Sequence, residues 1–304
     1  MIVVVCPGQG SQTPGFLSPW LEVPGLSERL ERYSEAAGLD LAAHGTTSDA
    51  DTIRDTKVAQ PLIVAAGLLT LHVLLQGRRD DVGGIAGHSV GELTAAAAAG
   101  ILSETDAMSL VAERGRAMAD AAAITPTGMS AVIGADESEL LARLGELGLE
   151  PANFNGAGQI VVAGALDALE ALGAEPPAGA RVIPLQVAGA FHTRYMEPAV
   201  DRLRSAAAAL QVSDPTLPIW TNHSGREVSG GREFLDLLVG QVSSPVRWDK
   251  CMQAFGEAGV TGIIEVAPAG ALVGLAKRAL KGVPTLAVKT PDDVHAAIEM
   301  MENS

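Results

Sequence analysis

The chain has 304 residues, of which 47% are apolar and 19% charged, a composition typical of a folded globular protein and not of a disordered one. Its 21 Lys and Arg residues against 36 Asp and Glu residues give a net charge of −15. Such an acidic surface opposes non-specific binding to nucleic acids and to anionic membranes, because both are polyanions. We therefore expect neither as a partner, and an acidic protein partner would need a local basic patch.

Cysteine content and hydropathy indicate a cytoplasmic location. Cys6 and Cys251 are the only cysteines, too few for a disulfide framework or a zinc site, so we expect both to be core residues in a reducing compartment. The apolar start of the chain lacks the basic region of a signal peptide. The longest nearly apolar run, residues 62–75, is shorter than the roughly 18 residues that suggest a membrane span.

The first part of the chain alternates strands and helices. Ile2–Cys6 is a continuous apolar run rich in β-branched residues, which predicts a strand buried on both faces of a parallel sheet. A turn signal, Pro7-Gly8-Gln9-Gly10, follows it. The next predicted elements are a helix at 61–76 with Pro61 in its first position, a strand at 82–86, and helices at 90–99 and 103–122.

The middle of the chain has a different order of elements. We predict strands at 129–133, 152–155, 159–163 and 181–187, with helices at 136–147 and 166–172, which together give the βαββαβ order of ferredoxin-like folds. The alternation then resumes, with helices near 194–210, 234–242 and 247–258 and from 271, and strands at 217–221, 262–266 and 285–289. The predicted fold is therefore α/β: a hydrolase-like parallel-sheet core, 1–125 and 190–304, with an inserted ferredoxin-like subdomain, 126–189, and a ligand cleft between them.

Residues 87–91, Gly-His-Ser-Val-Gly, carry the motif G-x-S-x-G between a predicted strand and a predicted helix. A sharp strand-to-helix turn of this kind exposes the serine oxygen as a nucleophile. The helix N-terminus behind it offers N–H groups, that of Val90 first, to a developing oxyanion. Ser89 is thus the predicted nucleophile. The alternative is a tight turn whose serine only caps the helix.

A serine nucleophile needs a base, and His192 is the best placed of six histidines. It ends the Gly189-Ala190-Phe191 turn at the return from the inserted subdomain, where it can face the cleft. The alternative is a surface or helix-capping histidine. No carboxylate stands out as a third group, and Glu92 suits a cap or a helix-dipole role better. The other histidines are His88, whose side chain should diverge from Ser89, His72, expected in the core because it lies in an apolar helix, His44 and His295, expected at the surface from their polar surroundings, and His223 as the reserve base.

Seven motifs in the chain, taken together and in order, resemble the malonyl-CoA:acyl carrier protein transacylases. The resemblance spans nearly the whole sequence and is far more specific than G-x-S-x-G alone. The motifs are GQGSQ at 8–12, QPL at 60–62, GHSVGE at 87–92, Arg114-Gly115, Asn153 to Asn155 with 159–164, GAFH at 189–192, and QVSSPVRW at 241–248.

The resemblance implies roles for individual residues. Arg114 matches the arginine that binds the malonyl carboxylate, although an arginine beside Glu113 and Arg116 also suits a solvated helix face. A bulky aromatic residue at Phe191 accompanies malonyl rather than methylmalonyl substrates. The other matched residues are Ser89 as nucleophile, His192 as base, Gln241 as the main-chain carbonyl that orients the histidine, Gln9 and Val90 as oxyanion-hole donors, and Asn155 as a polar residue near the site.

The implied function is transfer of malonyl from malonyl-CoA to the phosphopantetheine thiol of acyl carrier protein, through a malonyl-serine ester. It implies no metal or redox cofactor, and we expect a cytoplasmic monomer. Alternatives are a serine hydrolase or thioesterase, a non-catalytic carrier-binding protein, and the acyltransferase subunit of a polyketide or malonate decarboxylase system. The carrier should dock on a local excess of positive charge at Lys250, Lys277, Arg278 and Lys281.

Overall fold

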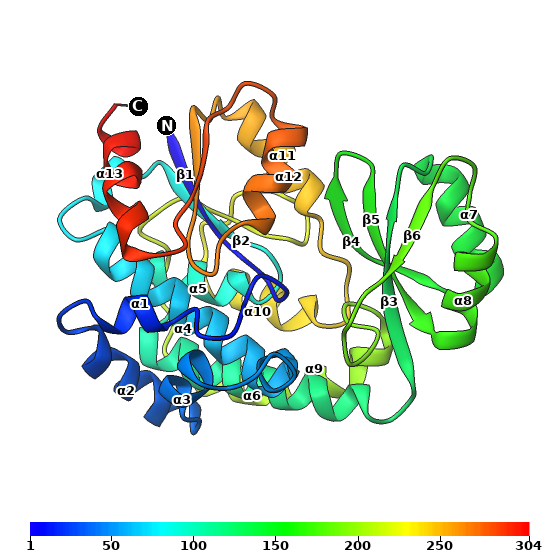
Figure 1. Ribbon diagram of the computed structural model, residues 1–304, viewed down its shortest axis with the longest axis horizontal. Helices are drawn as coiled ribbons and strands as arrows, with labels where there is room; N and C mark the ends of the chain where they lie inside the picture. The colour runs from blue at the N-terminus through cyan, green and yellow to red at the C-terminus, as the bar shows by residue number, and fades with distance from the viewer. Residues whose placement is uncertain (304) are drawn as a thin grey trace.

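The computed structural model of the chain describes residues 1–303 and contains two sheets that lie side by side (Figure 1). The first sheet has the strand order β7-β2-β1-β8-β9, and all its neighbouring strands are parallel. Its strands are β1 (Ile2–Cys6), β2 (Gly84–Gly87), β7 (Ile219–Trp220), β8 (Gly262–Glu265) and β9 (Thr285–Ala287).

Helices cover both faces of this parallel sheet, which explains the unbroken apolar run of β1. Ile2 and Val4 belong to the core cluster beneath one face, whereas Val3 and Val5 belong to the cluster on the opposite face. Successive strand residues point to opposite faces, so a strand covered on both sides must be apolar throughout. The helices of this part are α1 (Ser18–Leu21), α2 (Leu26–Ala37), α3 (Leu41–Thr46), α4 (Thr56–Leu74), α5 (Gly91–Ala98), α6 (Glu104–Ala122), α9 (Glu197–Ala208), α10 (Gly231–Gln241), α11 (Trp248–Glu257), α12 (Ala271–Ala279) and α13 (Val294–Glu302).

Helices α4, α5 and α6 pack on one side of the core sheet, and α11 and α12 pack on the other (Figure 1). The first three helices and α13 lie in stretches for which the sequence analysis predicted no element. Short 3₁₀ turns complete the connections, at η1 (Thr52–Arg54), η2 (Arg79–Asp81), η3 (Arg194–Met196) and η4 (Pro291–Asp293).

Helix α4 corrects two expectations. It begins at Thr56 and not at Pro61, because Asp55 caps it by accepting a hydrogen bond from the Lys57 N–H at 2.9 Å. His72, expected in the core, is exposed on its last turn. The helix is long and apolar enough to cross a membrane, but 78% of its apolar window is buried within the fold, as in the core helix of a globular protein.

The second sheet is antiparallel, with the strand order β4-β5-β3-β6. This order and the βαββαβ sequence of elements are those of a ferredoxin-like fold, so the predicted fold class is confirmed. Its helices lie on the outer face, away from the core (Figure 1). The division of the chain into domains at residues 126 and 189 stays a prediction. The elements are β3 (Thr127–Ile133), α7 (Glu137–Leu147), β4 (Glu150–Gly156), β5 (Gln159–Ala165), α8 (Leu166–Ala174) and β6 (Arg181–Pro184).

The segment after α10 joins the two sheets. Val246 lies beside β4, where it accepts a hydrogen bond from the Phe154 N–H and donates one to the Ala152 carbonyl, both at 2.9 Å. Arg247, the next residue, stacks over the Phe154 ring with its guanidinium carbon 4.4 Å from the ring centre. These contacts hold the C-terminal end of α10, and Gln241 with it, at the boundary between the core and the ferredoxin-like sheet.

Candidate active site

Ser89 lies in the turn between β2 and α5, at the carboxyl edge of the parallel sheet. Its backbone has a φ of 53°, in the left-handed region that non-glycine residues seldom adopt. The turn is tight: a Cβ on Gly87 would lie 2.0 Å from the Gly91 carbonyl carbon, and one on Gly91 would lie 2.2 Å from the Cys6 oxygen. Only glycine fits at these two positions. The motif therefore forms the strained elbow that the sequence predicts and exposes the serine oxygen to a pocket.

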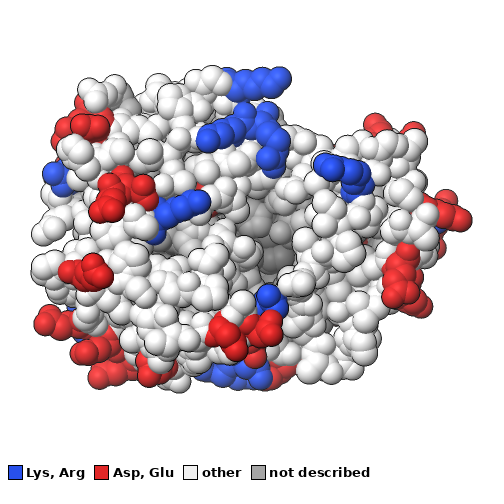
Figure 2. Space-filling view, in the orientation of Figure 1, with Lys and Arg blue, Asp and Glu red and all other residues white. Residues whose placement is uncertain are grey.

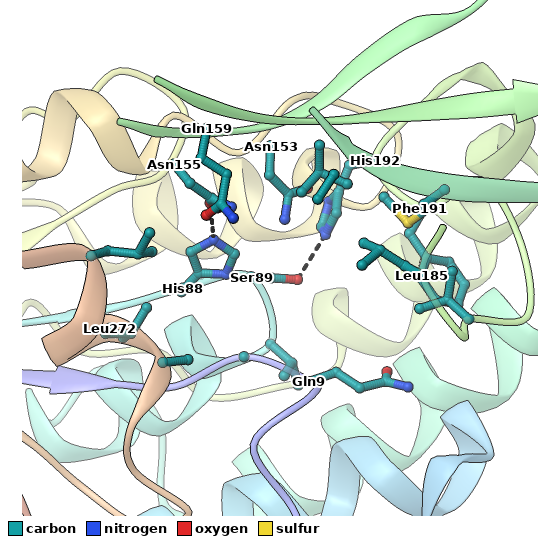
Figure 3. Close-up of a pocket in the computed structure, with 18 of the residues that line it drawn as sticks. Gln9, His88, Ser89, Asn153, Asn155, Gln159, Leu185, Phe191, His192 and Leu272 are labelled. Atoms are coloured by element: carbon teal, nitrogen blue, oxygen red, sulfur yellow. Dashed lines mark hydrogen bonds between the residues drawn. The ribbon is translucent and has the colours of Figure 1, made fainter. Parts of the chain in front are cut away.

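His192 meets Ser89 across this pocket (Figure 3). Its Nε2 lies 2.7 Å from the Ser89 Oγ, and its Nδ1 lies 2.8 Å from the main-chain carbonyl oxygen of Gln241. Because a carbonyl oxygen only accepts, Nδ1 carries the proton and Nε2 is free to accept the serine hydroxyl proton. Burial, together with the positive charge of Arg114, lowers the pKa of His192 to about 3. The imidazole is thus neutral at pH 7 and can act as a base.

Arg114, on α6, is buried beside these two residues, with 1% of its surface exposed. Its guanidinium donates to Gln60 Oε1 at 2.7 Å, to Gln241 Oε1 at 2.9 Å and, more weakly, to Ser89 Oγ at 3.4 Å. Its Nε has no partner within residues 1–303. The alternative of a solvated helix face is therefore wrong for Arg114, whereas Arg116 does lie exposed on that face. Burial lowers the pKa of Arg114 to about 10, so the group stays charged near neutral pH.

The pocket has a volume of about 400 Å³, and both sheets contribute to its walls. Gln9, from the turn after β1, lies opposite His192, and Phe191 and Leu185 form the wall near β6 (Figure 3). The main-chain N–H groups of Gln9 and Val90 are bonded to no acceptor within residues 1–303. In the same part of the chain, His, Cys, Asp and Glu side chains form no group of three that could hold a metal ion.

His88 points away from Ser89 and connects the elbow to the ferredoxin-like sheet. Its Nε2 lies 3.0 Å from Asn155 Oδ1 on β4, and Asn155 Nδ2 donates to Gln159 Oε1 at 3.4 Å (Figure 3). The His88 ring also packs edge-on against Trp248, with ring centres 5.7 Å apart. Asn155 therefore borders the pocket and contacts the elbow through His88.

Asn222 is a site residue that the sequence analysis missed. It is fully buried, accepts the Ser89 N–H on its Oδ1 at 2.8 Å, and donates from Nδ2 to the Gly87 carbonyl at 2.7 Å. It thereby holds both sides of the elbow. The available signal was its position two residues after β7, at the same sheet edge as the elbow. The neighbouring His223, our reserve base, is exposed instead.

Two more residues of the site lie in matched motifs to which the sequence assigned no such contacts. Gln60 accepts the hydrogen bond from Arg114, and Glu92 contacts two other site residues. Glu92 is 1% exposed, and its carboxylate accepts the Asn222 N–H and the Gln241 side-chain N–H, each at 2.6 Å. Glu92 lies in the first turn of α5, the position expected for a helix-dipole role, but it does not cap that helix, because its carboxylate bonds to Asn222 and Gln241 instead. Burial raises the pKa of Glu92, whereas the Asn222 N–H and the positive charge of Arg114 lower it. Both oxygens of the group accept hydrogen bonds from N–H donors, which is the pattern of an ionised carboxylate.

Comparison with known proteins agrees with this geometry. The model of the acyl transferase domain family matches residues 3–297. The malonyl CoA-acyl carrier protein transacylase of Mycobacterium tuberculosis (strain ATCC 25618 / H37Rv) is 53% identical over 298 residues, 97% of this chain and 98% of the relative.

Solved structures of malonyl transacylases superpose on this chain over nearly its whole length. The crystal structure of MCAT from Mycobacterium tuberculosis superposes with a TM-score of 0.94 at 52% identity, over 98% of this chain and 99% of that one. A malonyl-transacylase in complex with its type II PKS acyl-carrier protein superposes with a TM-score of 0.92 at 30% identity, over 98% and 99% of the two chains. A serine elbow and a neutral histidine thus share one pocket, beside a buried arginine bonded to the serine, in a chain that these proteins match over nearly its whole length. The resemblance is confirmed: the chain belongs to the acyl transferase family.

Proposed function

We propose that this protein transfers a malonyl group from malonyl-CoA to the phosphopantetheine thiol of an acyl carrier protein, in two half-reactions on Ser89. The relatives bear the name malonyl CoA-acyl carrier protein transacylase and cover nearly the full chain, which supports the assignment. The roles of the individual residues follow from their contacts.

In the first half-reaction, His192 Nε2 takes the Ser89 hydroxyl proton as Oγ attacks the thioester carbon of malonyl-CoA. Charge that develops on the thioester oxygen is stabilised by the N–H groups of Val90 and Gln9. The carbon–sulfur bond then breaks, and coenzyme A leaves as its thiol with the proton from His192. Ser89 is left as a malonyl ester.

In the second half-reaction, the carrier's phosphopantetheine thiol enters the same pocket and gives its proton to His192. Its sulfur attacks the ester carbon, and the tetrahedral intermediate collapses to expel the Ser89 oxygen, which recovers the proton. Atoms and charges are thus restored after each cycle. Both acyl carriers end in the same phosphopantetheine arm, so one pocket serves both steps.

The observation that carries the choice of malonyl is the position of Arg114. Its buried guanidinium lies 3.4 Å from Ser89 Oγ, within reach of the free carboxylate of a three-carbon acyl group on that oxygen. A carboxylate in such a pocket is costly unless it is paired, and a guanidinium pairs with it through two charge-assisted hydrogen bonds.

We further propose that the protein works as a cytoplasmic monomer and requires no metal or redox cofactor. The two cysteines are buried and unpaired, which supports a location in a reducing compartment.

The decisive experiment follows the mass of the intact protein. Incubation with malonyl-CoA should add one malonyl group, and the adduct should persist until holo-acyl carrier protein removes it. Steady release of malonate without any thiol acceptor would instead identify a serine hydrolase. Absence of an adduct, combined with binding of the carrier, would identify a non-catalytic carrier-binding protein.

A further inference from the structure

Glu92 is a buried ionisable residue that the two half-reactions do not use. It lies in the first turn of α5, three residues after Ser89, and its carboxylate is turned toward two amide-bearing residues rather than toward the pocket. Both of its oxygens are engaged by Asn222 and Gln241, so neither oxygen is turned toward an acyl group on Ser89. Any role of Glu92 in the reaction must therefore act through its neighbours.

The two carboxylate oxygens of Glu92 have distinct partners. Oε1 accepts the main-chain N–H of Asn222, and Oε2 accepts the side-chain N–H of Gln241, each at 2.6 Å. The second contact fixes which end of the Gln241 amide faces which way. With Nε2 held toward Glu92, the amide oxygen Oε1 points at Arg114 and accepts from its Nη2 at 2.9 Å.

The other contacts of Gln241 agree with this orientation. Its Nε2 also faces two acceptors, Asn222 Oδ1 at 3.1 Å and the Ser89 carbonyl at 3.3 Å. A rotated amide would put its oxygen against these acceptors and against the carboxylate, and its NH₂ against the guanidinium. A carboxylate only accepts and a guanidinium only donates, so these two groups impose the direction of the amide between them.

Charge adds a second reason for the arrangement. Glu92 and Arg114 are both buried, at 1% exposure each, and Gln241 bridges them. An isolated buried charge costs several kcal/mol, whereas an opposite charge reached through a fully bonded bridge offsets part of that cost. Removing the carboxylate of Glu92 therefore disturbs the guanidinium that lies 3.4 Å from Ser89 Oγ.

From these contacts we propose that Glu92 is a positioning residue for malonyl transfer: its carboxylate orients the Gln241 side-chain amide, which in turn holds the Arg114 guanidinium where the malonyl carboxylate binds. The inference rests on the proposed function, since it assigns Glu92 to the recognition of a free carboxylate. It concerns the side chain of Gln241 alone, because His192 is oriented by the main-chain carbonyl of that residue.

Glu92→Gln is the single substitution that tests this role most directly. The amide oxygen of the substituted side chain can still accept the Asn222 N–H, but its NH₂ group then faces the Gln241 NH₂. Rotating the Gln241 amide only moves the clash to Arg114. We expect kcat/KM for malonyl-CoA loading to fall on the order of 10- to 100-fold, from one mispaired buried donor. Acetyl-CoA loading involves no carboxylate, so its kcat/KM should change less than about threefold, as for a substitution that removes no contact to the substrate.

A double-mutant cycle tests whether Glu92 acts through Gln241. Gln241→Met keeps the main-chain carbonyl for His192 but removes the amide. If the proposal holds, the E92Q/Q241M protein loads malonyl no more slowly than Q241M, since the shared intermediary is already gone. Additive losses in the double variant, or equal losses for malonyl and acetyl in E92Q, would overturn it.

A control substitution and a second pair of variants complete the test. Glu265→Gln makes the same change at another buried carboxylate, which accepts main-chain N–H groups at the start of α12, so it should leave the malonyl-to-acetyl ratio unchanged even if stability falls. If E92Q does not fold, a second pair of variants replaces it. Gln241→Glu places a new carboxylate against that of Glu92, and E92Q/Q241E removes this repulsion. The double variant should therefore load malonyl faster than Q241E. No recovery there contradicts the proposal.

The same series separates this inference from the proposed function. Arg114→Ala, assayed alongside, should lower malonyl loading relative to acetyl loading. If it does not, the malonyl assignment itself fails. If it does, and E92Q leaves the ratio unchanged, only the role of Glu92 is refuted.

Discussion

Arg114 Nη2 and Ser89 Oγ lie 3.4 Å apart although the two residues are 25 positions apart in sequence. The nucleophile and a buried cation are therefore direct neighbours. In the proposed reaction, a malonyl ester on the serine keeps its carboxylate beside the guanidinium through both half-reactions. Single substitutions can therefore test whether acyl transfer and recognition of the carboxylate depend on different side chains.

Ser89→Ala should abolish covalent loading from malonyl-CoA and leave the fold intact. Removal of a nucleophile of this type lowers turnover by about 10⁶-fold. The measurement is intact mass after incubation with malonyl-CoA, with circular dichroism to check the fold. Malonyl transfer at the wild-type rate would exclude an ester on this serine.

Arg114→Ala should lower kcat/KM for malonyl-CoA steeply, since truncating one member of a buried charge pair costs about 2–5 kcal/mol. Loading from acetyl-CoA should hold or improve, because for a neutral acyl group the guanidinium is an unpaired buried charge. Arg114→Lys should recover little, since a point charge lacks the planar fork. An equal fall for both substrates in the Ala variant would make Arg114 structural.

The low pKa of His192 predicts an unusual pH profile. Neutral His192 is the active form, and its pKa lies near 3 instead of 6.5. We therefore expect kcat/KM for acetyl-CoA loading to stay level from pH 8 to about pH 5. Arg114→Ala removes a positive charge that lowers this pKa, so the acid limb should move to higher pH.

Folding must be monitored in that experiment. The unfolded chain protonates this histidine near pH 6.5, whereas the folded chain does not, so this group makes the fold less stable as pH falls below 6.5. A fall in loading centred on pH 6.5 while circular dichroism is unchanged would contradict the shifted pKa.

Phe191 is 6% exposed and forms part of the pocket wall next to His192. Phe191→Ser should narrow the malonyl-to-methylmalonyl ratio of kcat/KM by enlarging the space for a branched acyl group. One methyl group in a pocket is worth about 1–3 kcal/mol, so the wild-type preference should be strong but incomplete. Competition between the two CoA esters measures the ratio, and an unchanged value would assign the selection to another wall.

A basic patch at the pocket mouth should steer the carrier. Lys277, Arg278 and Lys281 are exposed on and after α12, and Arg278 also lines the pocket. Figure 2 shows Lys and Arg side chains gathered above the central hollow, whereas acidic side chains lie below the hollow and toward the left and right edges of this face. Electrostatic steering raises association rates and is screened by salt.

Lys277→Glu should therefore raise KM for the carrier at low salt and spare loading from malonyl-CoA, because Lys277 lies outside the pocket lining. Arg204→Glu, at an exposed position on α9, is the matched charge reversal. The steady-state rate with varied carrier is the measurement. An identical carrier KM in the Lys277 variant and the wild type at low salt would place docking elsewhere.

Local patterns were enough to predict the scaffold and the two reacting residues. The apolar run of β1, the glycine-flanked serine and the βαββαβ order each follow from interactions between residues near in sequence, such as strand propensity, turn sterics and hydrophobic period. The prediction for the His192 segment also came from its local context, between a turn and a helix. Helix α2 escaped prediction although it is amphipathic, because its N-cap is Gly25, which has no side chain to signal the start of the helix.

The environment of the site was decided by tertiary structure alone. From sequence, Arg114 suits a solvated face, Glu92 a helix cap and Asn222 a loop, and nothing local contradicts those interpretations. Burial and hydrogen-bond partners change each of them: Arg114 meets Gln241 across 127 positions, Glu92 meets the same residue across 149, and Asn222 meets Ser89 across 133. The free energy of a buried charge or amide depends on which groups surround it in space, and the chain brings those groups together only when both sheets and α10 are in place.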